Sequence, residues 1–225
     1  MTKRKDETSY RQTVFGIIPR SKLIPLEIEG IKRAWDFILK KRKKTKISIT
    51  PALIKKVHEV GFAWIFPKEG GNFRKVEVTV SDHAPPRHYL VSQFMDSYCK
   101  DLKERLKHLP TLDQADFLEE LVRFLAWAHH RFLWIHPFKD YNGRIGRLLI
   151  NFILLNLDLP PIGLKVETKV GRKKYVQALK NADDGDYLSL EKIIREAVEE
   201  TTEDLSIIWE KIRQTSHIPK RYVKF

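Results

Sequence analysis

A twelve-residue segment from His136 to Arg147, HPFKDYNGRIGR, constrains this chain more than any other part of it. The segment runs directly into an apolar stretch, LLINFILL, that has the composition of a buried helix. A helix that begins just after a short loop leaves its first backbone N–H groups unpaired, and these groups bind phosphate readily. The sequence therefore predicts an anion-binding helix N-terminus at this point of the chain.

The charged side chains of the segment add the other parts of a nucleotide-phosphate site. Arg144 and Arg147 are three residues apart and share a helix face, where both can bind a phosphate tail. Asp140 precedes the loop and can hold a divalent cation, and His136 can take a proton near neutral pH as a general base. Each also has a structural alternative, because Asp140 can cap the helix and most arginines lie on the surface.

The segment resembles the signature of the Fic/Doc family, H-x-F-x-[D/E]-G-N-G-R-x-x-R, and seven of the eight constrained positions match. The resemblance implies a protein adenylyltransferase, which moves AMP from Mg-ATP to a Tyr, Ser or Thr hydroxyl of a target protein. In that reaction His136 deprotonates the hydroxyl and Asp140 binds Mg²⁺. The implied nucleotide-binding residues are Tyr141, Asn142, Gly143, Arg144 and Arg147.

Tyr141 is the position that departs from the signature, because the family usually has glycine there. If the loop needs a positive φ at this position, a tyrosine is strained where a glycine is not. A side chain there could also crowd the phosphates, although the contact attributed to this position is made by the backbone. We therefore expect Tyr141 to leave the fold intact and to bear on which phosphate is attacked.

Helical periodicity dominates the rest of the chain. Apolar residues at three- and four-residue spacing predict an amphipathic helix over Leu26–Lys40, and Thr50-Pro51 is a cap and first turn of the next helix. Further helices are expected near Arg87, over 113–135 with Asp113 as its cap, near 172–181 and over 188–213. The predicted fold class is mainly α: a Fic-like helical bundle with a small β-hairpin flap.

The period changes between Phe73 and Val80, where valines alternate with Glu77 and Thr79, so this stretch is expected to be a strand or a hairpin arm. The resemblance implies that such a flap precedes the motif and aligns a segment of the target protein. The candidate flap residues are Arg74, Lys75, Val76, Glu77 and Val78.

The resemblance covers about Thr50 to Arg195 and suggests three parts. These are an N-terminal segment, 1–49, a catalytic core, 50–195, and a C-terminal helix with a basic tail, 196–225. The first part contains Glu29-Gly30, which resembles the family's inhibitory motif [S/T]-x-x-x-E-[G/N] with Pro25 in place of Ser or Thr. Glu29 would then neutralise Arg147 and repel the γ-phosphate, unless it is an ordinary charged residue on a solvent-exposed face. A separate antitoxin-like inhibitor is also conceivable.

The chain carries a net charge of +13, and its densest basic cluster is Lys40–Lys46. Such a cluster suits a helix end or a contact with an acidic protein or nucleic acid, but no nucleic-acid-binding motif accompanies it. Cys99 is the single cysteine, so an internal disulfide is excluded. No apolar run is long enough for a bilayer, and the N-terminal residues TKRKDET lack the apolar core expected of a signal peptide. A cytoplasmic protein is expected.

Three functions fit the sequence. The first is protein adenylyltransfer, and the second is phosphotransfer, or transfer from another nucleotide, on the same fold. The third belongs to another class: a non-catalytic basic adaptor for nucleic acid or an acidic protein. His136, Asp140 and both motif arginines are intact, which favours the enzymatic functions over the adaptor.

Overall fold

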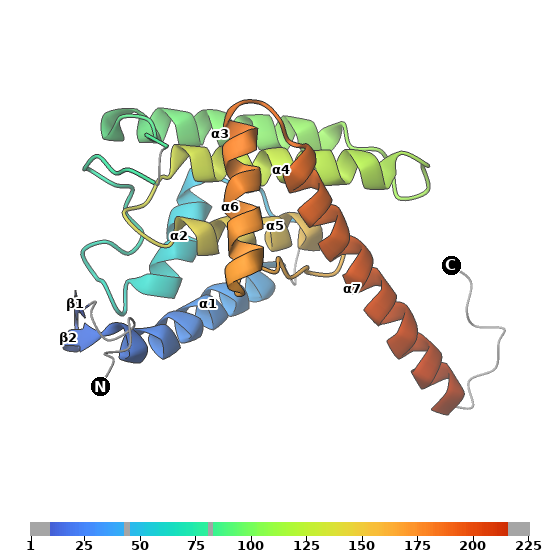
Figure 1. Ribbon diagram of the computed structural model, residues 1–225, viewed down its shortest axis with the longest axis horizontal. Helices are drawn as coiled ribbons and strands as arrows, with labels where there is room; N and C mark the ends of the chain where they lie inside the picture. The colour runs from blue at the N-terminus through green and yellow to red at the C-terminus, as the bar shows by residue number, and fades with distance from the viewer. Residues whose placement is uncertain (1–9, 43–45, 81–82, 216–225) are drawn as a thin grey trace. The chain divides into compact units, whose positions relative to one another are not determined.

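The structure is a computed structural model that describes residues 10–42, 46–80 and 83–215. It is mainly helical with one small antiparallel sheet, as the sequence predicts (Figure 1). The elements are β1 (Tyr10–Thr13), β2 (Gly16–Pro19), α1 (Arg20–Arg42), α2 (Pro51–Phe62), η2 (His88–Leu90), α3 (Val91–Lys107), α4 (Phe117–Ile135), α5 (Asn142–Asn156), α6 (Lys169–Asp183) and α7 (Leu188–Thr215). They form two compact units, residues 1–159 and 160–225.

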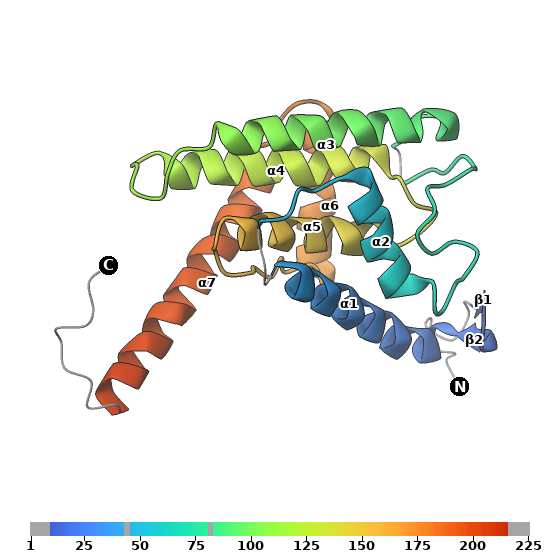
Figure 2. The ribbon, with the colours of Figure 1, turned by 180° about the vertical axis from the view of Figure 1, so that it is seen from behind.

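The first unit is built from helices that pack closely along their apolar faces. α3 and α4 lie side by side, and the Tyr98 hydroxyl of α3 donates to the Ala128 carbonyl of α4 at 3.0 Å (Figures 1 and 2). α1 crosses α2 at two glycines, because a Cβ added to Gly30 would lie 2.2 Å from the Gly61 carbonyl oxygen. Gly30 is thus explained by helix packing alone.

Of the two helix caps predicted from the sequence, Thr50 is confirmed and Asp113 is wrong. Thr50 caps α2 as predicted, since its hydroxyl accepts the Leu53 N–H at 3.1 Å. The predicted cap at Asp113 is wrong, because α4 begins only at Phe117 and Asp116 occupies the cap position. Two successive turns, from Thr111 to Gln114 and from Gln114 to Phe117, separate Asp113 from the helix.

The predicted strand between Phe73 and Val80 is also wrong. Within the described residues this stretch forms no strand: it bends at Lys75 and Val76, and its backbone–backbone contacts are the Arg74 N–H to the Pro137 carbonyl and one isolated bridge between Val80 and His83. Alternation favours an extended backbone, but a strand also needs a partner ladder, and nothing in the described chain supplies one here. The two-stranded sheet lies instead at the N-terminal end, where Tyr10 pairs with Pro19 and Thr13 with Gly16.

The second unit contains α6 and α7, both close to the predicted ranges. The Thr168 hydroxyl caps α6 by accepting the Gly171 N–H at 3.0 Å. Of the basic cluster Lys40–Lys46, residues 43–45 lie outside the described residues, as does the tail 216–225. Among the helices that are described, none is long and apolar enough to cross a membrane.

Candidate active site

The motif loop joins the end of α4 to the start of α5 and is closed by a side chain of its own. The Asn142 Oδ1 accepts the Phe138 N–H at 2.9 Å, and its Nδ2 donates to the Phe138 carbonyl at 2.8 Å. The Phe138 ring is fully buried and stacks on His58 with centroids 3.8 Å apart. These contacts hold the loop in place, so its backbone N–H groups have fixed directions.

The N-terminus of α5 lies where the sequence predicts an anion-binding helix end. The N–H groups of Arg144 and Ile145 both donate to the Tyr141 carbonyl at 3.0 Å, so those of Asn142 and Gly143 precede the hydrogen-bond ladder of the helix. Arg147 lies over the same turn, because a Cβ added to Gly143 would be 3.6 Å from its Nη1. Arg147 has no hydrogen bond or ion pair with any other described residue, so it can receive a phosphate.

Arg144 is held differently from Arg147. Its Nη2 donates to the Glu27 carboxylate at 2.7 Å, whereas its Nη1 is buried and has no hydrogen-bond partner among the described residues. A buried guanidinium N–H without an acceptor is unfavourable, and an anionic ligand at the loop would satisfy it.

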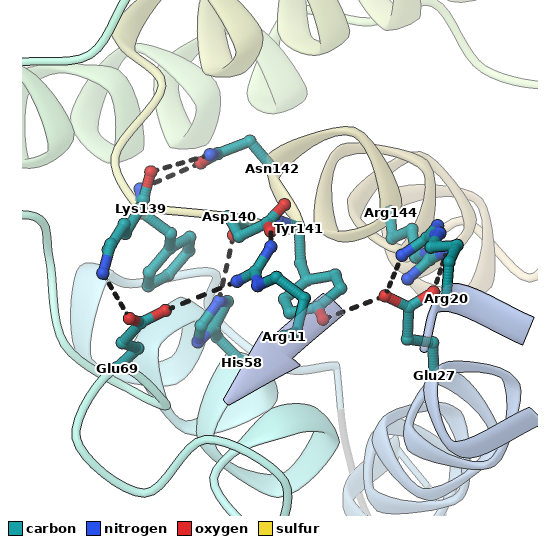
Figure 3. Close-up of polar contacts among 11 residues, drawn as sticks. Arg11, Arg20, Glu27, His58, Glu69, Lys139, Asp140, Tyr141, Asn142 and Arg144 are labelled. Carbon is teal, nitrogen blue, oxygen red and sulfur yellow. Dashed lines mark hydrogen bonds and ion pairs between the residues drawn. The ribbon is translucent and has the colours of Figure 1, made fainter. Parts of the chain in front are cut away.

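Tyr141 does adopt the positive φ that the signature glycine would allow, with φ 67° and ψ 9°. The strain is offset by packing, because its ring stacks on Phe62 at 3.9 Å with an interplanar angle of 6°. Its hydroxyl donates to Glu27 at 3.0 Å, so the side chain is anchored against α1 and α2 (Figure 3). Burial and the Glu27 carboxylate raise the pKa of Tyr141, so the phenol stays protonated.

Asp140, the predicted metal ligand, is engaged on both carboxylate oxygens. Its Oδ1 accepts the Tyr141 N–H and its Oδ2 accepts Nη1 of Arg11, each at 2.7 Å. Arg11 comes from β1 and also lies 4.0 Å from Glu69 (Figure 3). No group of three or more His, Cys, Asp or Glu side chains in the described chain could hold a metal by itself. A divalent cation at Asp140 would therefore have to take most of its ligands from outside the described residues and would compete with Arg11 for the carboxylate.

His136 ends α4 in a left-handed conformation, with φ 49° and ψ 59°. Burial, and then the positive charge of Arg74 and the proximity of His83, lower its pKa to about 4, against the effect of a hydrogen bond to the Leu133 backbone. The imidazole is therefore neutral near pH 7 and can accept a proton. This is the state that a general base requires.

Residues 48–154, which include the loop, all of α4 and α5 as far as Leu154, match the Fic/DOC family. The chain belongs to this family. Protein adenylyltransferase Fic of Culex quinquefasciatus is 31% identical over 175 residues, which are 78% of this chain and 33% of that protein. Its counterpart in Drosophila grimshawi is 33% identical over 156 residues, 69% of this chain and 30% of that protein. The chain thus spans about a third of the length of these curated relatives.

Solved structures show the same Fic fold. A Fic-1 fragment from C. elegans superposes with a TM-score of 0.63 at 24% identity, over 82% of this chain and 52% of that one. The BepC protein of Bartonella tribocorum, solved with bound AMPPNP, gives a TM-score of 0.64 at 16% identity, over 86% and 94% of the two chains.

The residues of the expected flap differ in how far they are exposed. Lys75, Val76 and Glu77 are exposed and Val78 is half-buried, but the Arg74 side chain is fully buried behind the Fic motif. The guanidinium Nε donates to the His136 carbonyl at 2.8 Å, so Arg74 cannot face a target protein. Its placement corrects the prediction for this residue.

Sequence reasoning missed Glu27, which lies close to the Fic motif where Glu29 was expected to act. Glu27 is 1% exposed and accepts from Arg20 at 2.6 Å as well as from Tyr141 and Arg144 (Figure 3). The structure does not bring Glu29 to Arg147, because its 47% exposed side chain bonds Arg33 at 3.0 Å. One signal could have found Glu27: it is in phase with the buried α1 positions Leu23, Gly30, Ala34 and Ile38.

Two buried histidines, His58 and His129, pack against residues of the Fic motif, 136–147. His58 accepts the Gly71 N–H on Nδ1 at 2.9 Å, so its Nε2 carries the proton and faces the Asp140 carbonyl at 3.3 Å. Burial lowers its pKa to about 4. His129 packs against Gly146, where an added Cβ would lie 3.2 Å from its ring. Burial, and then the Arg147 charge, lower its pKa to about 3, consistent with a structural role.

Proposed function

We propose that the protein is a protein adenylyltransferase that moves AMP from ATP to a hydroxyl side chain of a target protein. The observation that carries the proposal is the neutral His136 imidazole, which precedes a helix N-terminus flanked by Arg144 and the uncommitted Arg147. The curated relatives are named protein adenylyltransferase, which supports the same activity. Tyr141 leaves room for it, because its side chain packs against Phe62 and Glu27.

In the proposed reaction His136 takes the proton of a target Tyr, Ser or Thr hydroxyl. The hydroxyl oxygen attacks the α-phosphorus of ATP, forms a phosphodiester bond, and the bond to the β-phosphate oxygen breaks, so pyrophosphate leaves. The N–H groups of Asn142 and Gly143, with the arginine side chains, would hold the phosphates and stabilise the charge that develops on them. The transferred AMP thus comes from ATP, and the proton of the target hydroxyl goes to His136.

Asp140 is the residue that would hold Mg²⁺, and the bound ion would neutralise phosphate charge. Arg11 now bonds the Asp140 oxygen that is not used by the Tyr141 N–H. Arg11 would therefore share this carboxylate with the ion or leave it when Mg-ATP binds.

The exposed part of the segment after Arg74, residues Lys75 to Glu77, is proposed to contact the target protein. Its backbone groups other than the Val76 carbonyl, which accepts from Arg74, could pair with an extended target segment. The target, a possible antitoxin-like inhibitor, nucleic-acid binding and a cytoplasmic location stay predictions. So does the three-part organisation into residues 1–49, 50–195 and 196–225.

The test compares ATP labelled on the α-phosphate with ATP labelled on the γ-phosphate, each incubated with the protein and a cell lysate. We expect the α label, but not the γ label, to appear on protein. His136→Ala should abolish the labelling. The matched control, His108→Ala, removes a 76% exposed histidine at the end of α3 and should leave it unchanged. Transfer of the γ label alone would instead establish a phosphotransferase.

A further inference from the structure

The buried guanidinium of Arg74 lies at the C-terminal end of α4, where it contacts the backbone of His136. Its side chain is 0% exposed, although the rest of the segment around it lies largely at the surface. The Nε group donates to the His136 carbonyl at 2.8 Å, and Nη2 donates to the carbonyls of Ile135, at 3.4 Å, and Pro86. Nη1 donates to the Val76 carbonyl at 3.1 Å.

Arg74 also uses its backbone on the same turn, since its N–H donates to the Pro137 carbonyl at 2.8 Å. One residue thus binds the carbonyls of Ile135, His136 and Pro137 in succession. These carbonyls lie on both sides of the His136 φ and ψ torsions, so a rotation of that residue would break several hydrogen bonds at once. The last carbonyls of a helix otherwise lack partners, and a cation suits them.

The conformation that Arg74 holds is one that histidine does not favour. His136 has φ 49° and ψ 59°. This is a left-handed geometry, and the residue that adopts it at a helix end is usually glycine. A side chain in this geometry leaves the helix in a direction that the ordinary helical conformation does not permit. The direction of the imidazole therefore depends on the contacts that keep the turn left-handed.

We propose that Arg74 is a positioning residue of the transfer reaction, which clamps the turn at the end of α4 so that the His136 imidazole faces the attacking hydroxyl. This inference rests on the proposed adenylyltransferase function. Glu77 lies 3.6 Å from the Arg74 Nη1 and links the clamp to the exposed segment that would meet the target. The Arg74 charge has a second effect in the same direction, because it helps to lower the pKa of His136 and to keep it neutral.

The test measures AMP transfer and nucleotide binding separately in Arg74→Ala and Arg74→Lys. The lysine variant keeps a cation in the buried site but cannot reach the same set of carbonyls, so it remains informative if Arg74→Ala does not fold. Arg123→Ala is the control, because it removes a 55% exposed arginine of α4 that pairs with Glu119 and Glu120, at the other end of the helix from His136. We expect kcat to fall by about a hundredfold in both Arg74 variants, since a small misplacement of a catalytic group has that effect.

Affinity for the ATP analogue AMPPNP should change less than about twofold in the Arg74 variants, because the phosphate-binding loop is left intact. Millimolar guanidinium should restore part of the rate of Arg74→Ala and none of the rate of His136→Ala. An unchanged kcat would overturn the proposal. An equal loss of kcat and AMPPNP affinity would also overturn it, because it would indicate a general collapse of the site.

A readout without catalysis separates this inference from the proposed function. NMR spectra of protein labelled in its histidine rings, with the His136 signal assigned by His136→Gln, should show that signal shifted in the Arg74 variants and unshifted in Arg123→Ala. A His136 signal that stays in place would overturn the positioning role. If the wild-type protein transfers no label, the proposed function fails, and the NMR spectra still decide whether Arg74 holds His136.

Discussion

At the scale of single residues, Tyr141 shows how a signature glycine can be replaced. Its φ of 67° is the conformation that glycine adopts most easily, and it carries a strain of about 1–2 kcal/mol for other residues. The stacking on Phe62 and the hydrogen bond to Glu27 offset that strain. The residue that departs from the Fic signature therefore fixes the loop to α1 and α2.

Replacing Tyr141 with Phe removes only the hydroxyl. We expect the free energy of unfolding to fall by about 1–2 kcal/mol, because the hydrogen bond to the buried Glu27 is lost while the stacking on Phe62 remains. Urea denaturation measures the change. Equal stability of the variant and the wild-type protein would contradict the role given to the hydroxyl.

Glu27 and Glu29 make a matched pair for testing which carboxylate restrains the phosphate site. In Glu27→Gln, Arg20 and Arg144 lose their shared charge partner, so the free energy of unfolding should fall by about 2 kcal/mol without nucleotide. AMPPNP should bind about tenfold more tightly, equivalent to about 1.4 kcal/mol, because the arginines are left for the phosphates. Calorimetry measures both effects.

Glu29→Gln is the control, because among the described residues its carboxylate pairs only with Arg33, one turn further along the same helix. We expect neither stability nor AMPPNP affinity to change measurably, since an exposed pair of this kind contributes little. A stronger effect of Glu29→Gln than of Glu27→Gln would restore the original assignment of the inhibitory residue.

At the scale of elements, the N-terminal hairpin brings a cation to the motif. β1 positions Arg11 against Asp140, and β2 leads into α1, which carries Glu27. The hairpin is also fixed to the turn that follows α2, because the Val14 N–H donates to the Ile65 carbonyl at 3.1 Å. An element outside the family-matched residues 48–154 thus contributes a charge to the site.

Arg11→Gln should raise the affinity for a divalent cation. The variant removes the positive charge that now bonds Asp140, and a half-exposed pair of this kind corresponds to about a threefold change. Titration of Mn²⁺ in the presence of AMPPNP, followed by electron paramagnetic resonance, measures it. Arg33→Gln removes an arginine that pairs with Glu29 and serves as the control. Unchanged Mn²⁺ affinity in Arg11→Gln would show that Arg11 does not compete for the carboxylate.

The sequence predicted the helices and the motif because both depend on local patterns. Thr50 caps a helix through residues three positions away, and Asn142 closes the loop within the motif itself. The wrong strand between Phe73 and Val80 and the unexpected role of Arg74 depend on which distant segments meet, and spacing along the chain does not contain that information. Glu27 was missed because resemblance to a motif outweighed the helical phase of α1.

At the scale of the whole molecule, three histidines are held neutral. The pKa values of His58 and His136 lie at about 4 and that of His129 at about 3, all lowered chiefly by burial from the ordinary value of 6.5. At a pH between the lowered pKa values and the ordinary value of 6.5, these histidines bind protons in the unfolded chain but not in the folded chain. Stability is therefore fully present above about pH 6.5 and declines as the pH falls towards the folded values.

We expect the urea midpoint to fall steadily between about pH 6.5 and pH 5, with a loss of about 2 kcal/mol for each of the almost fully buried His58 and His129. In His58→Gln this dependence should be weaker, because one of the titrating groups is gone. A midpoint that stays constant over this range would contradict the neutral state assigned to the histidines, including His136.

The central claim is that His136 directs AMP to a protein hydroxyl, and mass spectrometry of the product tests it most directly. Protein incubated with unlabelled ATP and a lysate should yield a peptide that carries the mass of one AMP on a Tyr, Ser or Thr side chain. The adduct should be absent when His136→Ala is used. A peptide that carries only a phosphate group, or an AMP adduct that persists in His136→Ala, would contradict the account.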